Sequence, residues 1–356
     1  MEPNTKMISE HKPKRIVYFD ILNIFAILAV IALHCNDVVH TYNWVKHSTW
    51  STSLIVECIC YWAVPVFLML TGANLMKYRE RYDTKIFFKK RVMKVVIPLI
   101  FWMILMTMWK ISIGTLKINE YSIKNFANIF LNNKMESTYY FMFLILGMYL
   151  LMPLISILTE SKYRKVCWYT VIVLFVTHSC LPVILKLLGI SWNSALSIPL
   201  GASVIFVLLG YLLSTQEINK KHRIILYCLG IISIIIRYVF TYNFTSINGK
   251  IDETLFGYSQ FHSVLLACAV FVFFKNINYD KIFKGEKSKK ILSKIASCSF
   301  GIYLIHKIVM HYETTIFNID NKSWQWRTIG VICTYIISLV IIYLIKKIPL
   351  LKKIVP

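Results

Sequence analysis

The sequence predicts an all-α integral membrane protein, a bundle of about ten transmembrane helices with both termini in the cytoplasm. Three observations predict this class. Hydrophobic residues make up 57% of the chain and charged residues 16%, and the mean hydropathy is +0.60. Soluble domains are about 45–50% apolar and about 25% charged. The apolar residues also fall in runs of about 20, the length that spans a bilayer, and lysines and arginines concentrate in alternate connections between the runs.

Ten apolar runs follow one another along the chain without a long polar insertion or an internal repeat. The expected spans are 16–38, 51–76, 93–113, 138–158, 166–187, 195–214, 222–242, 254–275, 291–312 and 326–346. We expect one membrane domain over 16–346, with cytoplasmic tails at 1–15 and 347–356. We read the first run as a membrane anchor, because no small-residue cleavage site follows it.

The positive charges set the expected topology. Of the 40 lysines and arginines, 29 lie in segments that alternate along the chain: the N-terminus, 77–94, 159–166, 215–223, 275–294 and the tail after 345. The positive-inside rule places these segments, and so both termini, in the cytoplasm. It also explains most of the net charge of +23 without a nucleic-acid partner, which would need the charge gathered on one folded face.

The first span is unusually polar. Asn23 and His34 are eleven positions apart, which places both on one stripe of a helix, about 16 Å apart along its axis. Asp20 lies one turn before Asn23 on nearly the same face. Polar groups inside a bilayer are costly, and they usually face a bundle interior or a watery cavity. The stripe therefore indicates a functional site, and the alternative is that these residues only hold helices together.

Other ionisable residues lie at a similar depth under this topology. Glu57, Arg237 and His306 fall in the outer halves of their spans with His34, and His262 lies near the middle of its span. We take His34, Glu57, His306 and Arg237 as candidate catalytic residues. The alternative is a set of buried structural pairs, such as Glu57 with Arg237.

The segment 77–98 is the most basic in the chain, and Lys89, Lys90, Arg91 and Lys94 lead into the third span. This pattern is typical of topology and of contact with anionic lipid headgroups. It also fits a phosphate clamp for a cytoplasmic ligand.

The nine cysteines lie in or beside apolar runs, and no pair has the spacing of a metal site. We interpret them as small packing residues and expect no metal.

Four motifs occur in an order that resembles the acyltransferase-3 family of membrane acyltransferases. They are YFDILN followed after ten residues by His34; VPVFLMLTGANL (64–75) with FFKKRVMKVVIPLIFW (87–102); YYFMFLILGMYLLMPLI (139–155); and SCSFGIYLIH (297–306). The resemblance spans nearly the whole chain and implies a ten-helix membrane core. It matches His34 and His306 to histidines of the family, and Arg91 and Lys94 to its basic motif.

The resemblance also implies an activity, in the cell membrane. Family members move acyl groups, usually acetyl from acetyl-CoA, onto hydroxyls of cell-surface sugars, peptidoglycan, antibiotics or lipids. The implied partners are acetyl-CoA or another acyl-CoA, a cell-surface glycan or lipid-linked sugar, and the bilayer; a separate extracytoplasmic partner could take the acyl group onward. The chain departs from the family at Asn23, where an arginine is usual. If that arginine holds an anionic part of the donor, Lys89, Lys90, Arg91 or Lys94 must replace it here.

These residues suggest a mechanism. We hypothesise that His34 is the general base for an acceptor hydroxyl, that Glu57 or Asp37 orients it, and that Arg237 or His306 stabilises the oxyanion. Asn23, Lys90, Arg91 and Lys94 would bind the donor.

Two other functions stay open. One is a transporter or exporter of a glycan or lipid intermediate, although the paired broken helices and inverted repeats of transporters are not visible. The other is a catalytically inactive membrane sensor. Protection of the basic loop by acyl-CoA would separate the enzyme from the transporter, and loss of function on changing His34 would separate it from the sensor.

Overall fold

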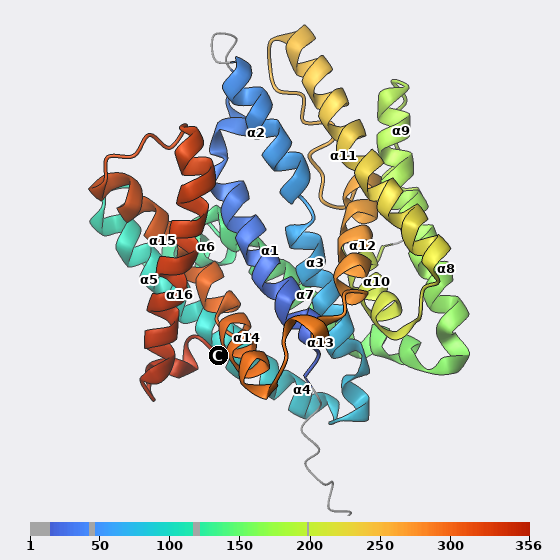
Figure 1. Ribbon diagram of the computed structural model, residues 1–356, viewed down its shortest axis with the longest axis horizontal. Coiled ribbons are helices and arrows are strands. Elements are labelled where there is room, and N and C mark those ends of the chain that lie inside the picture. Colours follow the sequence, from blue (N-terminus) through green and yellow to red (C-terminus); the bar gives the residue numbers. More distant parts are fainter. Residues whose placement is uncertain (1–14, 43–46, 117–121, 198) are drawn as a thin grey trace, which may run out of the picture.

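The computed structural model describes residues 15–42, 47–116, 122–197 and 199–356, and within these ranges the regular structure is helical, with no strand (Figure 1). The helices in chain order are α1 (Val17–Cys35), α2 (His47–Cys60), α3 (Ala63–Leu75), α4 (Thr84–Arg91), α5 (Ile97–Ser112), α6 (Ile123–Leu131), α7 (Tyr140–Ile155), α8 (Arg164–Leu174), α9 (Leu181–Leu187), α10 (Val204–Thr215), α11 (Lys220–Asn248), α12 (Phe261–Lys275), α13 (Tyr279–Ile282), α14 (Glu286–Ala296), α15 (Ser299–Ile316) and α16 (Val331–Lys347).

The expected helical membrane class is confirmed, whereas the expected count of about ten spans is not. Among the described residues, seven helices are long and apolar enough to cross a membrane: Val17–Cys35, Ser48–Glu80, Thr84–Ser112, Ser137–Thr159, Ser161–Leu187, Lys220–Asn248 and Trp326–Lys347. The pair α14 and α15 makes an eighth if it is counted as one span bent by 49°.

The two remaining expected spans are short helices. α10 has 12 residues and α12 has 15, so they are about 18 and 23 Å long, against about 30 Å of hydrocarbon. Every residue of α10 from 204 to 213 is buried, as is most of α12. Hydropathy predicted them as spans because a helix buried in protein on all sides is as apolar as one in lipid.

Glycines let α3 and α10 cross at close range. A Cβ atom built on Gly72 of α3 would lie 1.9 Å from the carbonyl oxygen of Val207 in α10. One built on Gly210 of α10 would lie 1.9 Å from the carbonyl oxygen of Met69 in α3. Small residues at helix crossings are typical of membrane bundles, because they bring the backbones together.

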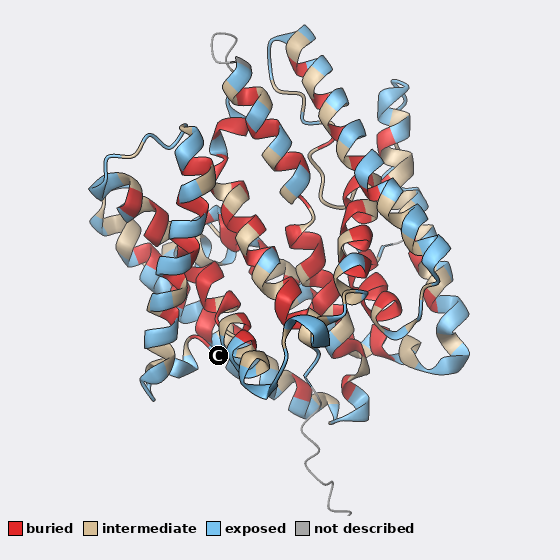
Figure 2. Cartoon of the chain, in the orientation of Figure 1, coloured by how far each residue is buried: buried red, intermediate tan, exposed pale blue. Residues whose placement is uncertain are grey.

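α1 runs through the middle of the bundle, in contact with α2, α3, α12, α14, α15 and α16 (Figure 1). Most of its apolar side chains are buried against these neighbours, and Leu22, Ala26, Ile27 and Ile31 are fully covered, whereas Phe25 is exposed. Figure 2 shows the same contrast across the molecule, with buried positions concentrated in the inner helices and exposed positions on the outer faces of α8, α11 and α16. The polar residues of α1 therefore face protein.

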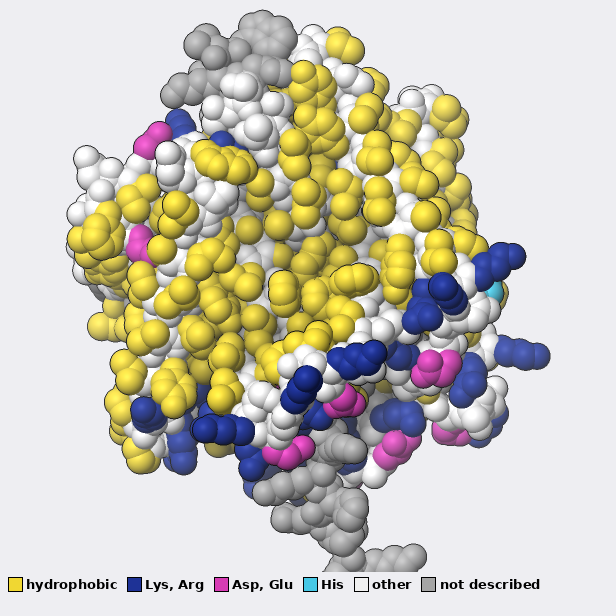
Figure 3. All heavy atoms as spheres, in the orientation of Figure 1, with side chains coloured by type: hydrophobic (Ala, Val, Ile, Leu, Met, Phe, Trp, Pro, Cys, Tyr) yellow, Lys and Arg dark blue, Asp and Glu magenta, His cyan; other side chains and the backbone are white. Residues whose placement is uncertain are grey.

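The surface has an apolar belt and one basic end. In Figure 3, hydrophobic side chains cover the middle of the visible face, and lysines and arginines gather along its lower edge. α4, α13, α14 and the C-terminus lie at that same end, as does the start of α1 (Figure 1). An apolar belt above a basic rim is the surface that a helical membrane protein presents to lipid. The side of the membrane on which this end lies remains a prediction.

Candidate active site

Two cavities open along α1. Asn23 lines the first, a cavity of about 390 Å³ that we call the arginine cavity, with Arg15, Thr71, Asn74, Arg91 and Tyr303 among its lining residues. His34 lines the second, about 290 Å³, which we call the histidine cavity, with Asp37, Trp109, Lys110, Glu136, Lys307 and His311 among its lining residues. The stripe predicted on α1 therefore faces two hollows, one near each end of the helix.

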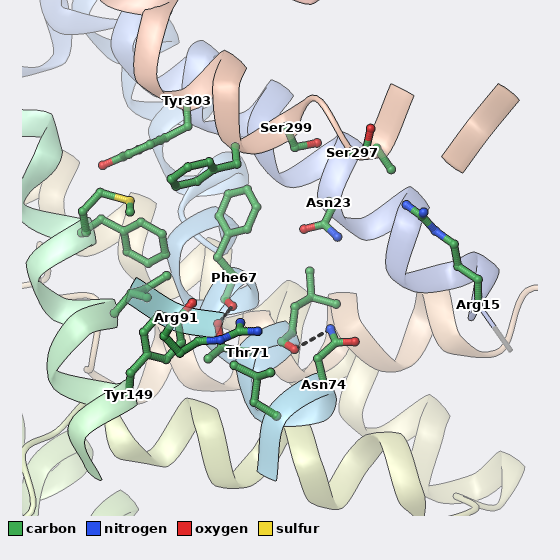
Figure 4. Close-up of a pocket in the computed structure, with 17 residues that line it drawn as sticks. Arg15, Asn23, Phe67, Thr71, Asn74, Arg91, Tyr149, Ser297, Ser299 and Tyr303 are labelled. Carbon is green, nitrogen blue, oxygen red and sulfur yellow. Dashed lines mark hydrogen bonds between the residues drawn. The ribbon is translucent and has the colours of Figure 1, made fainter. Parts of the chain in front are cut away.

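The arginine cavity combines one partly free guanidinium with several polar side chains (Figure 4). Arg91 is the last residue of α4, a helix capped by the Asp83 carboxylate, which accepts from the Ile86 amide at 2.7 Å. The Arg91 guanidinium carbon lies 5.5 Å from the centre of the Tyr149 ring. Its Nε is buried and has no hydrogen-bond partner within the described chain. A buried donor without a partner is costly, and an anionic ligand would satisfy it.

A second arginine lines the same cavity. Figure 4 places Arg15 and Arg91 toward opposite ends, with Asn23 between them. The Arg15 guanidinium already has partners within the protein. Its Nε lies 2.8 Å from an Asp20 carboxylate oxygen, and its Nη2 donates to the Ser293 carbonyl at 3.0 Å. Arg91 is therefore the cation with more capacity to bind a ligand.

Lys90 and Lys94, also predicted for donor binding, lie outside the lining of this cavity. The Lys90 ammonium lies 3.8 Å from the centre of the Tyr82 ring, and the Lys94 side chain is exposed. The structure thus brings Asn23 and Arg91 to one cavity and leaves the two lysines on the basic surface beside it.

His34 and His306 meet at the other end of α1. Their rings stack with centroids 5.2 Å apart and an interplanar angle of 28°. His306 is fully buried, and its Nδ1 lies 2.6 Å from the Tyr303 carbonyl oxygen. Because a carbonyl only accepts, Nδ1 is assigned as the protonated nitrogen. Nε2 of His306 then carries a lone pair, and it has no hydrogen-bond partner among the described residues.

Tyr303 forms part of the wall between the two cavities. It lines the arginine cavity, and its ring centre lies 5.9 Å from that of His306. Its hydroxyl donates to the Thr138 carbonyl, and the Tyr139 hydroxyl donates to the Leu304 carbonyl at 2.6 Å. These bonds fix α15 against the start of α7. A row of rings, Tyr303, His306 and His34, therefore leads from one cavity to the other.

An ion pair closes one side of the histidine cavity. The Lys110 ammonium lies 2.8 Å from a Glu136 carboxylate oxygen, and Glu136 also accepts from the amide and hydroxyl of Thr138. Burial by itself would raise the pKa of Glu136, but the Lys110 ammonium and the Thr138 amide outweigh it and hold the pKa of this carboxyl below its ordinary value. Glu136 is therefore ionised and fully paired at neutral pH.

The family model of the acyltransferase domain matches residues 16–343, nearly the whole chain. The chain belongs to the acyltransferase-3 family. No curated protein and no solved structure matches it. The family and the apolar helices together make the protein a multi-pass membrane acyltransferase.

Within this acyltransferase, the other predicted catalytic residues form a separate cluster. Arg237 of α11 lies 3.5 Å from a Glu57 carboxylate oxygen, donates to the Leu255 carbonyl at 2.9 Å, and stacks 3.6 Å from the centre of the Tyr61 ring. His262 bonds to Gln260 at 2.9 Å. In the described part of the chain, no hydrogen bond, ion pair or ring contact joins Glu57 or Arg237 to His34 or His306.

The remaining candidate, Asp37, is exposed and lines the histidine cavity with His34. Its position follows from the turn that continues α1, Asp37–His40.

Several lining residues of the acyltransferase were not predicted as part of a site. Tyr303 lies three positions before His306, so it shares a helix face with that histidine. Lys307 follows His306 directly, and Glu136 is a lone acid just before an expected span. These signals were present in the sequence, but nothing in the sequence distinguishes Lys110 and Lys307 from other lysines near the ends of apolar runs. Thr71 and Asn74 lie in the motif 64–75, but nothing marked them as lining residues, because hydroxyls and amides in apolar helices usually bond to their own backbone.

Proposed function

We propose that this acyltransferase moves an acyl group from acyl-CoA, with acetyl-CoA the expected donor, to a hydroxyl of a cell-surface glycan or lipid-linked sugar. One observation carries the proposal: His34 lines one polar cavity and stacks on His306, whose ring lies 5.9 Å from that of Tyr303 in the lining of the arginine cavity. A two-substrate transfer needs such an arrangement, because donor and acceptor must approach the same group from different directions.

The donor belongs in the arginine cavity in this proposal. CoA carries phosphates at one end of a long arm and the thioester at the other. The Arg91 guanidinium would bind a phosphate, helped by the amides of Asn23 and Asn74. Arg91 supplies charge that the family usually carries at the position of Asn23. The thioester arm would extend along α1 toward Tyr303 and the histidines.

His34 is the proposed general base. It removes the proton from the acceptor hydroxyl as the oxygen attacks the thioester carbonyl carbon. The carbon–sulfur bond then breaks, and the proton passes to the departing thiolate, so that the products are the acyl ester and the free thiol. A positioned base contributes about 10²–10⁴-fold to such a step.

His306 acts in this scheme by holding the ring of His34. In the assigned tautomer its free Nε2 accepts protons and does not donate, so a neutral His306 suits proton acceptance better than oxyanion stabilisation. Its stacked ring also fixes the plane of His34.

The proposal is tested by acyl transfer in membrane vesicles. Labelled acetyl-CoA is supplied to the face that carries the basic end, and glycan and lipid fractions are isolated. We expect label with the wild type and with His222→Ala, an exposed histidine outside both cavities, and none with His34→Ala at equal abundance. Wild-type turnover in His34→Ala would refute the base assignment, and no label in any folded variant would favour transport.

A further inference from the structure

The histidine cavity contains a cation that forms no ion pair or hydrogen bond with another described residue. Lys307 is half-buried in α15 and lines the cavity with His34. No ion pair or hydrogen bond to another described residue engages its ammonium, whereas Lys110 in the same lining is paired with Glu136 at 2.8 Å. A partly buried charge inside an apolar bundle usually has a partner.

The acidic residues of the cavity do not supply that partner. Glu136 is 3% exposed, and Lys110 and Thr138 bind its carboxylate directly. Lys307 acts on this carboxylate only through its charge, and less strongly than Lys110. Asp37 is exposed and forms no ion pair with Lys307. Solvent screens an exposed charge more strongly than a half-buried one, so Asp37 offsets Lys307 only weakly.

The rest of the lining suits a polar ligand. Trp109, His311 and Trp326 offer ring surfaces, and Thr314 and Asn321 offer a hydroxyl and an amide. The Trp109 indole nitrogen is buried and has no hydrogen-bond partner in the described chain, so it is an unused donor. A ligand with an anionic group and several oxygens would satisfy both Lys307 and Trp109.

We propose that the histidine cavity is the acceptor site and that it takes an acceptor bearing a phosphate or carboxylate, which Lys307 binds while the acceptor hydroxyl approaches His34. This inference rests on the proposed function, because the bound molecule is an acceptor only if the protein transfers acyl groups. The anion site itself does not depend on activity, so it is tested without a donor.

The test measures the electrostatic field in the cavity and its occupancy. Thr115 lines the cavity, is exposed and follows the end of α5, so Thr115→Cys provides a reporter thiol. The protein is placed in vesicles of phosphatidylcholine, and the thiol is labelled with a negatively or a positively charged methanethiosulfonate of similar size. Labelling of the nine native cysteines, measured without Thr115→Cys, is subtracted.

Three companion variants decide the outcome. We expect Lys307→Gln to lower the ratio of anionic to cationic labelling rates about tenfold, the effect of losing roughly one charge-assisted contact. Inorganic phosphate should slow labelling in the parent protein and in Lys307→Arg, which keeps the charge, but not in Lys307→Gln. Lys250→Gln removes the same charge from an exposed position outside the cavity lining and should behave as the parent.

Vesicle composition identifies the source of the anion. Protection that appears with phosphatidic acid in the vesicles and no added phosphate assigns the site to a lipid headgroup. Protection that requires added phosphate assigns it to a soluble anionic acceptor. Equal rate ratios in the parent and Lys307→Gln, or equal protection by phosphate in both, would overturn the proposal whether or not the protein transfers acyl groups.

Discussion

His34 and His306 lie 272 positions apart in sequence, yet their rings stack with centroids 5.2 Å apart. His306 is held by its own helix through the Tyr303 carbonyl, and His34 is held by the packing of α1. The contact therefore depends on the docking of α15 against α1. This docking brings the two imidazole rings together beside the histidine cavity.

The histidine pair is expected to behave as a unit in kinetics. His34→Ala and His306→Ala should each lower acyl transfer by about 10²-fold or more. The double variant should transfer acyl groups no more slowly than the slower of the two single variants. Transfer rates per folded protein in vesicles measure this. Independent losses that multiply in the double variant would contradict a shared role.

The α3–α10 crossing predicts a strong effect from one methyl group. Gly72→Ala should destabilise the protein by about 1–3 kcal/mol, because the new Cβ collides with the backbone of Val207. Thermal unfolding in detergent measures the loss. Gly147→Ala in α7 is the control, since its Cβ meets no atom within 4 Å among the described residues and alanine favours helix. Equal melting temperatures for the two variants would mean that the crossing is looser than the structure shows.

The Glu57–Arg237 pair predicts a loss of stability. Arg237→Met leaves the buried Glu57 carboxylate without its main partner, which costs about 3–5 kcal/mol for a buried pair. The double variant with Glu57→Gln should recover part of that loss, because no charge then remains unpaired. Denaturation of the single and double variants measures the coupling. If transfer per folded protein falls by more than about tenfold while stability is unchanged, the pair acts in catalysis and the structural alternative fails.

The Lys110–Glu136 pair predicts a pH dependence. The pKa of Glu136 is lower in the folded protein than its ordinary value of 4.5, so its ionised form stabilises the fold. That contribution is fully present above the ordinary pKa and disappears as the pH falls through the lowered value. The difference in melting temperature between wild type and Glu136→Gln should therefore be constant from pH 7 to about 5 and shrink below about 4. A difference that instead grew on acidification would contradict a pKa of Glu136 that is lower in the folded protein than in the unfolded one.

The structure divides the predicted site residues between two clusters for a physical reason. The stripe of Asn23 and His34 was predictable, because helix geometry alone fixes which residues of one helix share a face. Helix geometry does not give the partners of those residues: the family motifs grouped His34 with His306 and Asn23 with Arg91, whereas depth in the membrane places a residue along one axis only. Glu57 and Arg237 share the outer half of the bundle with His34 in the predicted topology, but they lie in their own cluster with Tyr61 and Leu255.

The sequence by itself determined the helical membrane class, since apolar runs in lipid must satisfy their backbone hydrogen bonds within the chain. It also determined the basic segments and the family motifs. Only the tertiary structure decided how many runs are long enough to span and which polar residues meet. α10 and α12 are as apolar as the spans around them, and what sets them apart is their short length together with a covering of protein. Likewise, the placement of Arg91 with Asn23 and of Lys307 with His34 arises from helix packing between distant segments, which no local pattern encodes.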